Sequence, residues 1–417
     1  MTTGRDHPGA AARRRYGGDM YDPTAEVHPR VWADHPTLAD VLPAIGTALG
    51  GLAPALPIPT ARDVVLLVVD GLGDVLLEQH RESAPSLTAL RAGTVRAGFP
   101  ATTATSITSL MSGTACGSHG IIGYSFRTAR DQTAGRERRT LNALRWTLDR
   151  SDGTSALDTY EPEAIAPHPG TIADLAARGV EITYAMPSAY RGSGFSRAAF
   201  RAVGEHVGAQ TPTELRTAII ELLRTHSTAP RFVYAYTPDL DAYGHLFGPG
   251  SPQWVEALGV VDRMVADVAA ELPSDAVLVV TGDHGMIQAD NRIDLDTVGG
   301  ALTGVEAVAG EMRVRHVYTR PGALDDVHAR WTSIVGDHAH LVRREQALDE
   351  AWFGGEVTDV IAERVGDLVA VARDTTILTR SLSEPTLEVE MPGHHGAWTA
   401  AEQFVPLLVA HSTSRAT

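Results

Sequence analysis

The chain has 417 residues, of which 43% are hydrophobic and 21% charged, so it can bury a large core and is not globally disordered. Its formal net charge is −16 and it contains no lysine, which argues against a nucleic-acid polymer or an anionic membrane surface as the main partner. An acidic protein can still bind a small phosphate ester if metal ions supply positive charge locally.

The N-terminal residues and the cysteine content indicate the compartment. Residues 1–22 lack the apolar segment of a secretory signal and are expected to form a disordered tail. No apolar stretch approaches the ~20 residues that span a bilayer. The single cysteine, Cys116, excludes a disulfide within the chain. These features favour the cytoplasm, and they do not indicate an oligomeric state.

Short apolar runs that alternate with helical patterns predict an α/β fold with a doubly wound, mostly parallel central sheet flanked by helices. In chain order, the strands of this sheet are expected at Val64–Val69, Ile182–Met186, Phe232–Tyr236, Ala276–Thr281 and Val405–Ala410. Helices are expected at Thr211–His226 and Ser251–Leu272, because each segment opens with a hydroxyl residue and a proline and continues with a helical apolar period.

Two segments fit this alternation less well. Residues 127–165 are polar and rich in Arg, Asp and Thr, so they are expected to leave the sheet in a long excursion. Residues from about 305 to 380 contain strand and helix patterns of their own. We therefore expect one catalytic domain over residues 23–417, with a small α+β subdomain inserted at about 305–380.

Acidic and histidine side chains follow two of the predicted strands. Asp70 ends the run Val64–Val69 and precedes a glycine, while Asp283 and His284 stand between glycines after Ala276–Thr281. The carboxyl ends of parallel strands form the crevice in which such sheets bind ligands, so these side chains are candidate metal ligands. Taken alone, Asp70 is better explained as a helix cap, whereas the second motif is equally explained as a turn with a solvated histidine.

Two further motifs mix acids, histidines and glycines. The string Pro238–Pro249 follows a predicted strand, and Asp241 and His245 lie four residues apart in it, on one face if the segment is helical. The alternative without metal binding is a polar loop in which Asp239 caps a helix. The string Gly393–Trp398 contains two adjacent histidines between glycines, and the residues alone do not decide which of the two is a ligand.

A run of hydroxyl side chains lies in the segment Phe99–Gly120. An apolar helical pattern follows Thr102, Thr103, Thr105 and Ser106. A hydroxyl at a helix N-terminus is favoured as an alkoxide by the helix dipole, and the free N–H groups there bind phosphate oxygens. Without the other motifs, a threonine-rich helix cap would be the better explanation of this segment.

Taken together, the motifs predict two cation sites in one crevice. Three aspartates, three histidines and one hydroxyl offer oxygen and nitrogen ligands, which suit Zn²⁺ first, with Mn²⁺ or Fe as alternatives. Paired metal ions with a hydroxyl between them promote in-line displacement at phosphorus.

The order of these motifs resembles the alkaline phosphatase superfamily, and most of all its nucleotide pyrophosphatase/phosphodiesterase (type I phosphodiesterase) branch, over about residues 63–410. That branch has a strand ending in Asp-Gly, a threonine nucleophile that opens a helix, a glycine ten residues later, a His-Gly pair, a Pro-Asp-x-x-Gly-His-like string, Asp-His-Gly and a late His-Gly. The matching residues here are Asp70-Gly71, Thr103, Gly113, His119-Gly120, Asp241 with Gly244-His245, Asp283-His284-Gly285 and His395-Gly396.

The resemblance implies roles for individual residues. One metal site would consist of Asp241, His245 and His395, and the other of Asp70, Asp283 and His284 with the Thr103 oxygen. Thr103 would attack phosphorus, and water would then release it from the covalent phospho-threonine intermediate. The spacing to Gly113 favours Thr103 over Thr102, and the late His-Gly favours His395 over His394.

Two departures from the branch bear on the substrate. The branch places an asparagine after its His-Gly pair, where it steadies a phosphate oxygen, whereas this chain has Gly123 and Tyr124 there. The Tyr124 hydroxyl or Arg127 is a candidate substitute. The Phe-Pro-Asn string that follows the nucleophile in the branch is missing as well. The sulfatase signature is also absent, and Cys116 is expected to be a buried packing residue.

The first functional hypothesis is therefore a metal-dependent hydrolase that cleaves phosphodiester or pyrophosphate bonds in small, nucleotide-type molecules. A phosphomonoesterase or a phosphonate hydrolase on the same two-metal site is the alternative. A catalytically dead scaffold is disfavoured because the six ligands and the hydroxyl are all present. Phosphotransfer between alcohols is disfavoured because the additional ligands and basic residues of such mutases are not seen.

Overall fold

A central seven-stranded sheet organises the computed structural model, which describes residues 22–30, 32–129, 138–149 and 153–412. The expected tail lies outside these ranges except for Asp22. The strand order across the sheet is β2-β18-β9-β1-β8-β6-β7. The strands are β1 (Asp63–Val69), β2 (Arg91–Arg96), β6 (Glu181–Met186), β7 (Glu205–Gly208), β8 (Arg231–Thr237), β9 (Ala276–Thr281) and β18 (Phe404–His411).

Most neighbouring strands of this sheet are parallel, as the sequence predicts. β1 runs parallel to β8 and β9, and β6 runs parallel to β7 and β8. The run at 405–410 is different, because β18 is antiparallel to both of its neighbours, β2 and β9. An apolar run reports that a strand is buried and carries no information on its direction, so its expected place among the parallel strands was wrong.

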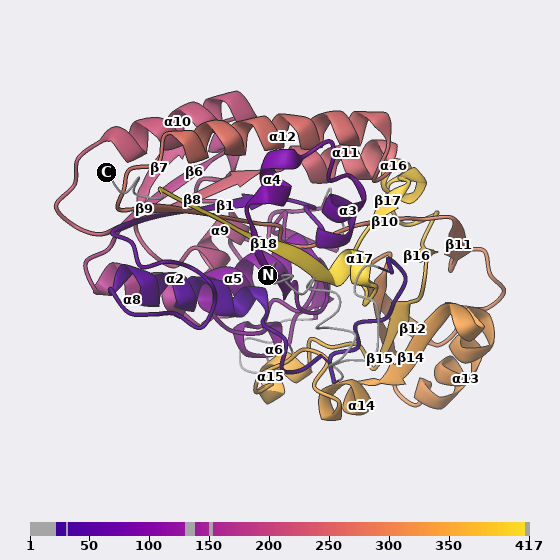
Figure 1. Cartoon of the computed structure of the whole chain (residues 1–417). Coiled ribbons are helices and arrows are strands. Elements are labelled where there is room, and N and C mark those ends of the chain that lie inside the picture. Colours follow the sequence, from indigo (N-terminus) through magenta and orange to yellow (C-terminus); the bar gives the residue numbers. More distant parts are fainter. Residues whose placement is uncertain (1–21, 31, 130–137, 150–152, 413–417) are drawn as a thin grey trace.

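Helices cover both faces of the central sheet (Figure 1), and β1 is therefore buried on both sides. Val64, Leu66 and Val68 belong to the hydrophobic core on one face, whereas Val65 and Leu67 belong to the core on the other, as a strand period of two requires. The first face is covered by α2 (Val41–Leu49), α5 (Thr103–Ser112) and α8 (Gly170–Ala177), and the second by α10 (Pro212–Arg224) and α12 (Pro252–Ala270). This is the expected doubly wound arrangement.

The two helices expected from the sequence begin where their caps predict. The side chains of Thr211 and Ser251 accept hydrogen bonds from backbone N–H groups three residues later, and a proline follows each cap. Both helices end two residues earlier than their apolar period indicates, which is the usual uncertainty at a frayed terminus.

A second, antiparallel sheet lies to one side of the central sheet, in orange at the lower right of Figure 1. It has the order β12-β13-β15-β14 and packs against α13 through a core that includes Val317, Trp331 and Leu368. Its elements are β12 (Val305–Glu311), β13 (Val314–Thr319), α13 (Leu324–Val335), β14 (Ala339–Arg343) and β15 (Leu368–Ala372). The sheet falls within the range expected for the inserted subdomain, and its independence as a subdomain stays a prediction.

The polar excursion contains a small three-stranded sheet that the sequence did not predict. Its strands are β3 (Ser125–Arg127), β4 (Thr140–Asn142) and β5 (Thr147–Leu148). Residues 130–137 and 150–152 of the excursion lie outside the described ranges.

The remaining elements are short and lie in the segments between the longer strands and helices. The helices are η1 (Leu38–Asp40), α3 (Asp74–Gln79), α4 (Pro85–Ala89), α6 (Cys116–His119), α7 (Pro162–Ile165), η2 (Ser188–Tyr190), α9 (Gly194–Ala199), α11 (Asp239–Phe247), η3 (Gly336–His338), α14 (Arg344–Asp349), α15 (Asp359–Ala362), α16 (Thr386–Glu390) and α17 (Ala400–Gln403). The strands are β10 (Ile287–Gln288), β11 (Asn291–Asp294), β16 (Thr376–Thr379) and β17 (Gly393–His394). Among the helices of the described ranges, none has the length and apolar character needed to span a membrane.

Candidate metal centre and nucleophile

Three central strands end together at one edge of the sheet. In the β1–β8 register Val69 pairs with Thr237, and in the β1–β9 register Val68 pairs with Thr281. The segments that follow these strands therefore start side by side, and they carry Asp70, helix α11 and the Asp283-His284 pair. Gly71 permits the close approach of the first two, because a Cβ at this position would lie 2.9 Å from the Cα of Asp241.

The first group of candidate ligands consists of Asp241, His245 and His395. Helix α11 places Asp241 and His245 one turn apart, so that His245 Nε2 lies 3.4 Å from Asp241 Oδ2. His395 Nε2 reaches the other oxygen of Asp241 at 3.8 Å. The short strand β17, which pairs with β10 just beyond His284, brings the late histidine segment to this place.

The second group consists of Asp70, Asp241 and His284, so that Asp241 is shared between the two groups. His284 Nε2 lies 3.4 Å from Asp70 Oδ1 and 3.5 Å from Asp283 Oδ2. The expected second site contained Asp283 in place of Asp241. The structure keeps Asp283 next to His284 and adds Asp241 as a carboxylate between the two groups.

Each of the three carboxylates has one oxygen without a hydrogen-bond partner. Asp283 Oδ1 accepts hydrogen bonds from the N–H groups of Gly71 and His284, and the Tyr236 hydroxyl donates to Asp70 Oδ2. The other oxygens, Asp70 Oδ1, Asp283 Oδ2 and one oxygen of Asp241, are buried and have no partner among the described residues. Buried polar atoms are rarely left unpaired, so these three oxygens together indicate a cation-binding site.

All three candidate histidine ligands are oriented in the same way. The Nδ1 atoms of His245, His284 and His395 lie 2.8, 3.1 and 2.9 Å from the backbone oxygens of Gly393, Gly285 and Ala101. A carbonyl oxygen can only accept, so Nδ1 carries the proton in each ring and Nε2 is left free to bind a metal ion. Backbone carbonyls commonly fix histidine ligands in this manner.

The neighbouring His394 differs from His395 at this point. Its Nε2 lies 2.9 Å from the carbonyl oxygen of Met391, and it belongs to neither ligand group. His395 belongs to the first group and its ring stacks on that of His284, with 3.6 Å between the ring centroids. The geometry thus favours His395 as the ligand.

Thr103 is the first residue of α5, and its hydroxyl faces the second ligand group. Thr103 Oγ1 lies 3.2 Å from His284 Nε2, and Thr102 precedes it with extended backbone angles. The first N–H groups of a helix have no partner within the helix, so they are available to phosphoryl oxygens. Gly113, ten residues later, ends the same helix in the left-handed conformation, so the spacing that favoured Thr103 is the length of α5.

Burial and like charges strain the ionised forms of this cluster. Burial, together with the Asp283 and Asp241 carboxylates, raises the pKa of Asp70 well above its usual range, and burial also raises the pKa of Asp283. Burial and the neighbouring His284 and His245 hold the pKa of His395 well below its usual range. The shift of His395 favours its neutral imidazole, which can bind a metal ion, and the shifts of Asp70 and Asp283 indicate that these carboxylates need a cation to stay ionised together.

The residues present therefore fit two divalent metal ions. Carboxylate oxygens and imidazole nitrogens that converge within 4.8 Å are the donors that Zn²⁺, Mn²⁺ and Fe share.

The structure separates the two candidate substrate-binding residues. Tyr124 lines a cavity of about 280 Å³ together with Asp241, His245 and His395. Arg127 does not line this cavity in the described part of the chain, because its guanidinium pairs with Glu306 at 2.6 Å and lies over the Tyr318 ring. Arg127 is therefore engaged elsewhere in this structure, which favours Tyr124 over Arg127 as the substitute for the asparagine.

His119 of the matched His-Gly pair has a structural role. Its Nε2 lies 3.0 Å from Ser109 Oγ and its Nδ1 accepts the N–H of Ile121, so it ties α6 to α5. Burial lowers the pKa of His119 to about 3, so the ring is neutral.

Two residues of the site carry no recognisable signal in the sequence. Tyr236 supports Asp70, and Glu311 lines the 280 Å³ cavity. Tyr236 was hidden inside an apolar strand, and Glu311 comes from β12 of the second sheet, whose place beside the centre only the tertiary structure reveals.

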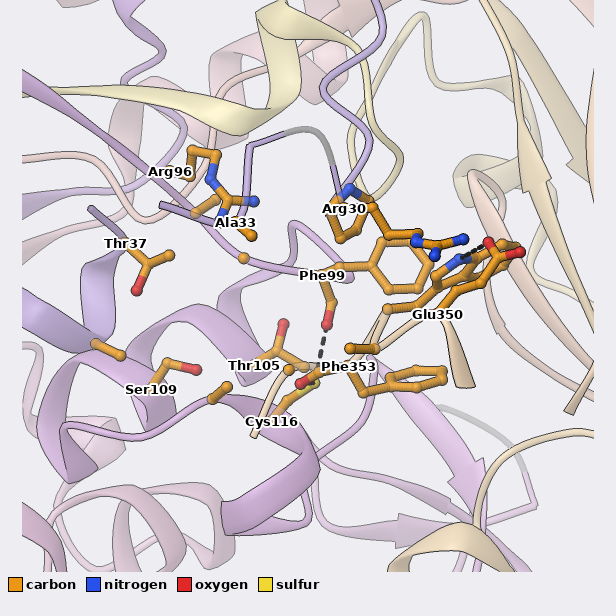
Figure 2. A pocket seen from close by; sticks show the side chains of 18 of the residues that line it. Arg30, Ala33, Thr37, Arg96, Phe99, Thr105, Ser109, Cys116, Glu350 and Phe353 are labelled. Atoms are coloured by element: carbon orange, nitrogen blue, oxygen red, sulfur yellow. Dashed lines mark hydrogen bonds between the residues drawn. The ribbon is translucent and has the colours of Figure 1, made fainter. Parts of the chain in front are cut away.

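A separate cavity of about 460 Å³ lies behind α5 and is lined by Thr105, Ser109 and Cys116 (Figure 2). The Cys116 thiol donates hydrogen bonds to the carbonyl oxygens of Phe99 and Phe353, and burial raises its pKa above the usual value. Cys116 is thus a buried packing residue, as expected.

Comparison with known proteins identifies a matching family and similar solved structures. The family model described as type I phosphodiesterase / nucleotide pyrophosphatase matches residues 64–398. Murine ectonucleotide pyrophosphatase / phosphodiesterase 5 has a similar structure, with a TM-score of 0.64 at 17% identity over 84% of this chain and 88% of that chain. An inactive variant of that murine protein in complex with AMP gives a TM-score of 0.62 at 16% identity, over 84% and 87%.

A bacterial enzyme shares the fold as well. Phosphonoacetate hydrolase from Sinorhizobium meliloti, in complex with phosphonoacetate, gives a TM-score of 0.60 at 17% identity over 86% of this chain and 92% of that chain. No curated protein matches the chain by sequence.

Proposed function

Because the chain belongs to the type I phosphodiesterase / nucleotide pyrophosphatase family of metal-dependent hydrolases, we propose that it cleaves phosphodiester or pyrophosphate bonds of small, nucleotide-type molecules with Thr103 as nucleophile. The observation that carries this proposal is the convergence of three unpartnered carboxylate oxygens beside the Thr103 hydroxyl. Unpartnered carboxylate oxygens in this arrangement destabilise the metal-free protein, and they suit a pair of cations that bind a phosphate ester.

Two divalent ions, for which the donors favour Zn²⁺, would act as Lewis acids that lower the pKa of a hydroxyl or water and neutralise phosphoryl oxygens. Asp241, His245 and His395 would hold one ion, and Asp70, Asp283 and His284 the other, with Asp241 close to both.

The protein side of the reaction has two steps. Thr103 Oγ1 forms a bond to phosphorus while the bond from phosphorus to the leaving alcohol or phosphate breaks, and the Thr103 proton passes by way of solvent to the leaving oxygen. The free N–H groups at the start of α5 hold the phosphoryl oxygens. Water then bonds to phosphorus, the bond to Thr103 Oγ1 breaks, and the hydroxyl is restored.

The cavity beside the centre favours a diester over a monoester. Its lining includes Glu384 and Glu388, and Arg145 is the only arginine among its lining residues in the described chain. Glu384 is already paired with Arg315 at 2.6 Å, and Glu388 lies 3.6 Å from Arg145, so both arginines already have a carboxylate partner and are less available to a second phosphate charge. A diester brings one negative charge into these surroundings, whereas a monoester dianion brings two.

A phosphomonoesterase or phosphonate hydrolase on the same site is the second candidate. The chain has Gly123 and Tyr124 where an asparagine is expected, so the contact to one phosphoryl oxygen is altered in a way that bears on the choice of substrate.

A substrate panel with matched variants tests the proposal. Metal content is measured first, and then hydrolysis of a chromogenic phosphodiester, a dinucleotide-type diester, a phosphomonoester and a phosphonate. Thr103→Ala is expected to abolish turnover. Thr108→Ala is the control, because the Thr108 hydroxyl bonds back to the Ala104 carbonyl within the same helix. Full activity of Thr103→Ala would refute the mechanism, and activity on the monoester or phosphonate alone would favour the second candidate.

A further inference from the structure

Glu311 is an acidic residue that the mechanism above does not use. It is the last residue of β12 and lines the 280 Å³ cavity together with Thr102 and the ligands Asp241, His245 and His395. The residue keeps part of its surface open, whereas its Oε1 atom is shielded from solvent.

The two oxygens of Glu311 have different surroundings. Oε2 accepts a hydrogen bond from the backbone N–H of Tyr124 at 3.1 Å. Oε1 has no hydrogen-bond partner in the part of the chain that the structure describes, and a Cβ at Gly396, next to His395, would lie 3.0 Å from it. A buried polar atom without a partner costs about 1–3 kcal/mol, so its retention beside the metal ligands points to a ligand that completes it.

We propose that the Glu311 carboxyl binds the substrate directly, by donating a hydrogen bond from Oε1 to a non-bridging oxygen of the phosphoryl group. This inference rests on the proposed function, and it names the chain's own group for that oxygen. Tyr124, which holds Glu311 in place, stands where the resemblance implies an asparagine, so a carboxylic O–H would here replace an amide N–H.

The protonation state of Glu311 supports a donor role. In the metal-free protein, burial raises the pKa of Glu311 to about 8, so the carboxyl is mostly protonated at neutral pH. Among the groups around it, the Tyr124 N–H, Arg315 and the Thr102 hydroxyl oppose this shift, whereas Glu402 adds to it. A protonated carboxyl attracts a phosphate oxygen, while an ionised one would repel it.

The test compares Glu311→Gln, which keeps a donor, with Glu311→Ala, which removes it. The control is Glu306→Gln, because Glu306 lies on the same strand, is largely exposed and pairs with Arg127 outside the cavity. We expect kcat/KM for a chromogenic phosphodiester to fall about 10²–10³-fold in Glu311→Ala, as for loss of one donor to a reacting oxygen, and to stay within about threefold of wild type in Glu311→Gln. Metal content should not change in any of the three variants.

A phosphorothioate diester of defined configuration gives a readout that a structural role would not move. Sulfur accepts hydrogen bonds poorly, so the isomer whose sulfur faces Glu311 should react more slowly than the other isomer. This difference between the isomers should shrink in Glu311→Ala and persist in Glu306→Gln.

Binding of inorganic phosphate to the metal-loaded protein, measured by calorimetry, separates the two proposals. A weaker phosphate affinity in Glu311→Ala alone would support the role of Glu311 even if the wild type hydrolysed no diester, in which case only the proposed function fails. The inference is refuted if Glu311→Ala matches wild type in turnover and phosphate affinity, or if Glu311→Gln is as impaired as Glu311→Ala.

Discussion

The two adjacent histidines, His394 and His395, have different tasks because their ring nitrogens meet different backbone oxygens. His395 uses Nδ1 for Ala101 and keeps Nε2 for the first ligand group, whereas His394 uses Nε2 for Met391. The sequence offers both rings in equal standing, and only the resemblance or the structure separates them.

This difference predicts the effect of removing each ring. His395→Ala should lose about one of two bound metal ions and most of the activity, because one of three ligands to the first site is gone. His394→Ala should keep its metal, although it loses a buried contact. Metal content by mass spectrometry after dialysis decides the matter, and loss of metal in His394→Ala alone would reverse the assignment.

Glu311 makes a second prediction at this scale, on the stability of the metal-free protein. Its pKa is raised from 4.5 to about 8, so the stability that the protonated group gives is complete below pH 4.5 and is lost as the pH rises toward 8. Glu311→Gln cannot lose a proton. Its advantage in free energy of unfolding over wild type should therefore grow between pH 4.5 and 8, to a few kcal/mol at ~1.4 kcal/mol per pH unit.

Denaturant unfolding at pH 4.5, 6 and 8 measures this advantage. Glu306→Gln serves again as the control and should show no such trend. A constant difference between Glu311→Gln and wild type at all three pH values would contradict the raised pKa.

At the scale of elements, a buried ion pair joins the second sheet to the segment that carries His395. Arg313, in the turn between β12 and β13, donates two hydrogen bonds to Glu402 of α17, at 2.9 and 2.7 Å, and both side chains are fully buried. Glu402 also accepts from the Ala397 N–H and the Thr399 hydroxyl, so it fixes the turn that follows the histidine pair.

Breaking this pair should destabilise the protein strongly. Glu402→Gln leaves the Arg313 charge buried without compensation, and we expect a loss of about 3–5 kcal/mol in the free energy of unfolding. The double variant Arg313→Met/Glu402→Gln should lose less than Glu402→Gln alone. The exposed pair of Arg216 and Asp267 provides the comparison, since Asp267→Asn should cost under about 1 kcal/mol. Equal losses in Glu402→Gln and Asp267→Asn would contradict this account.

Elements also show what the sequence could predict. The strands β1, β6, β8 and β9 and the helices α10 and α12 were predicted because their apolar periods and caps are local signals. The direction of β18 and the meeting of Glu311 with the metal ligands depend on contacts between distant segments, which a local pattern does not contain. The motif residues Asp70, Asp241 and Asp283 were found because each follows a recognisable strand, yet the shared position of Asp241 was not.

At the scale of the whole molecule, there is a trade-off between stability and function, because the carboxylates of the candidate metal centre lower the stability of the metal-free fold. Three buried or half-buried carboxylates face one another with unpartnered oxygens, so the metal-free fold carries electrostatic strain. Divalent ions relieve this strain, and at a hundredfold excess over the dissociation constant one bound ion adds about 2.7 kcal/mol to the free energy of unfolding.

Asp70→Asn should reveal both sides of this trade. The amide oxygen can still accept from the Tyr236 hydroxyl, while one repelling charge is removed. We expect a higher Tm than wild type in the presence of chelator, a smaller rise in Tm on addition of Zn²⁺ or Mn²⁺, and little activity. A variant less stable than wild type in chelator would show that Asp70 stabilises the fold by itself.

The position of β18 bears on how the protein is made. This strand lies between β2 and β9, yet it is the last strand of the sheet to be synthesised. Until it emerges, the edges of β2 and of the apolar strand β9 that it will cover are unpaired, and such edges invite misassembly and chaperone binding. His395 emerges only nine residues before β18 begins, so the last ligand arrives almost together with the strand that closes the sheet. The candidate metal centre and the central sheet are thus completed almost together during synthesis, and a nascent chain that has not reached His395 has neither.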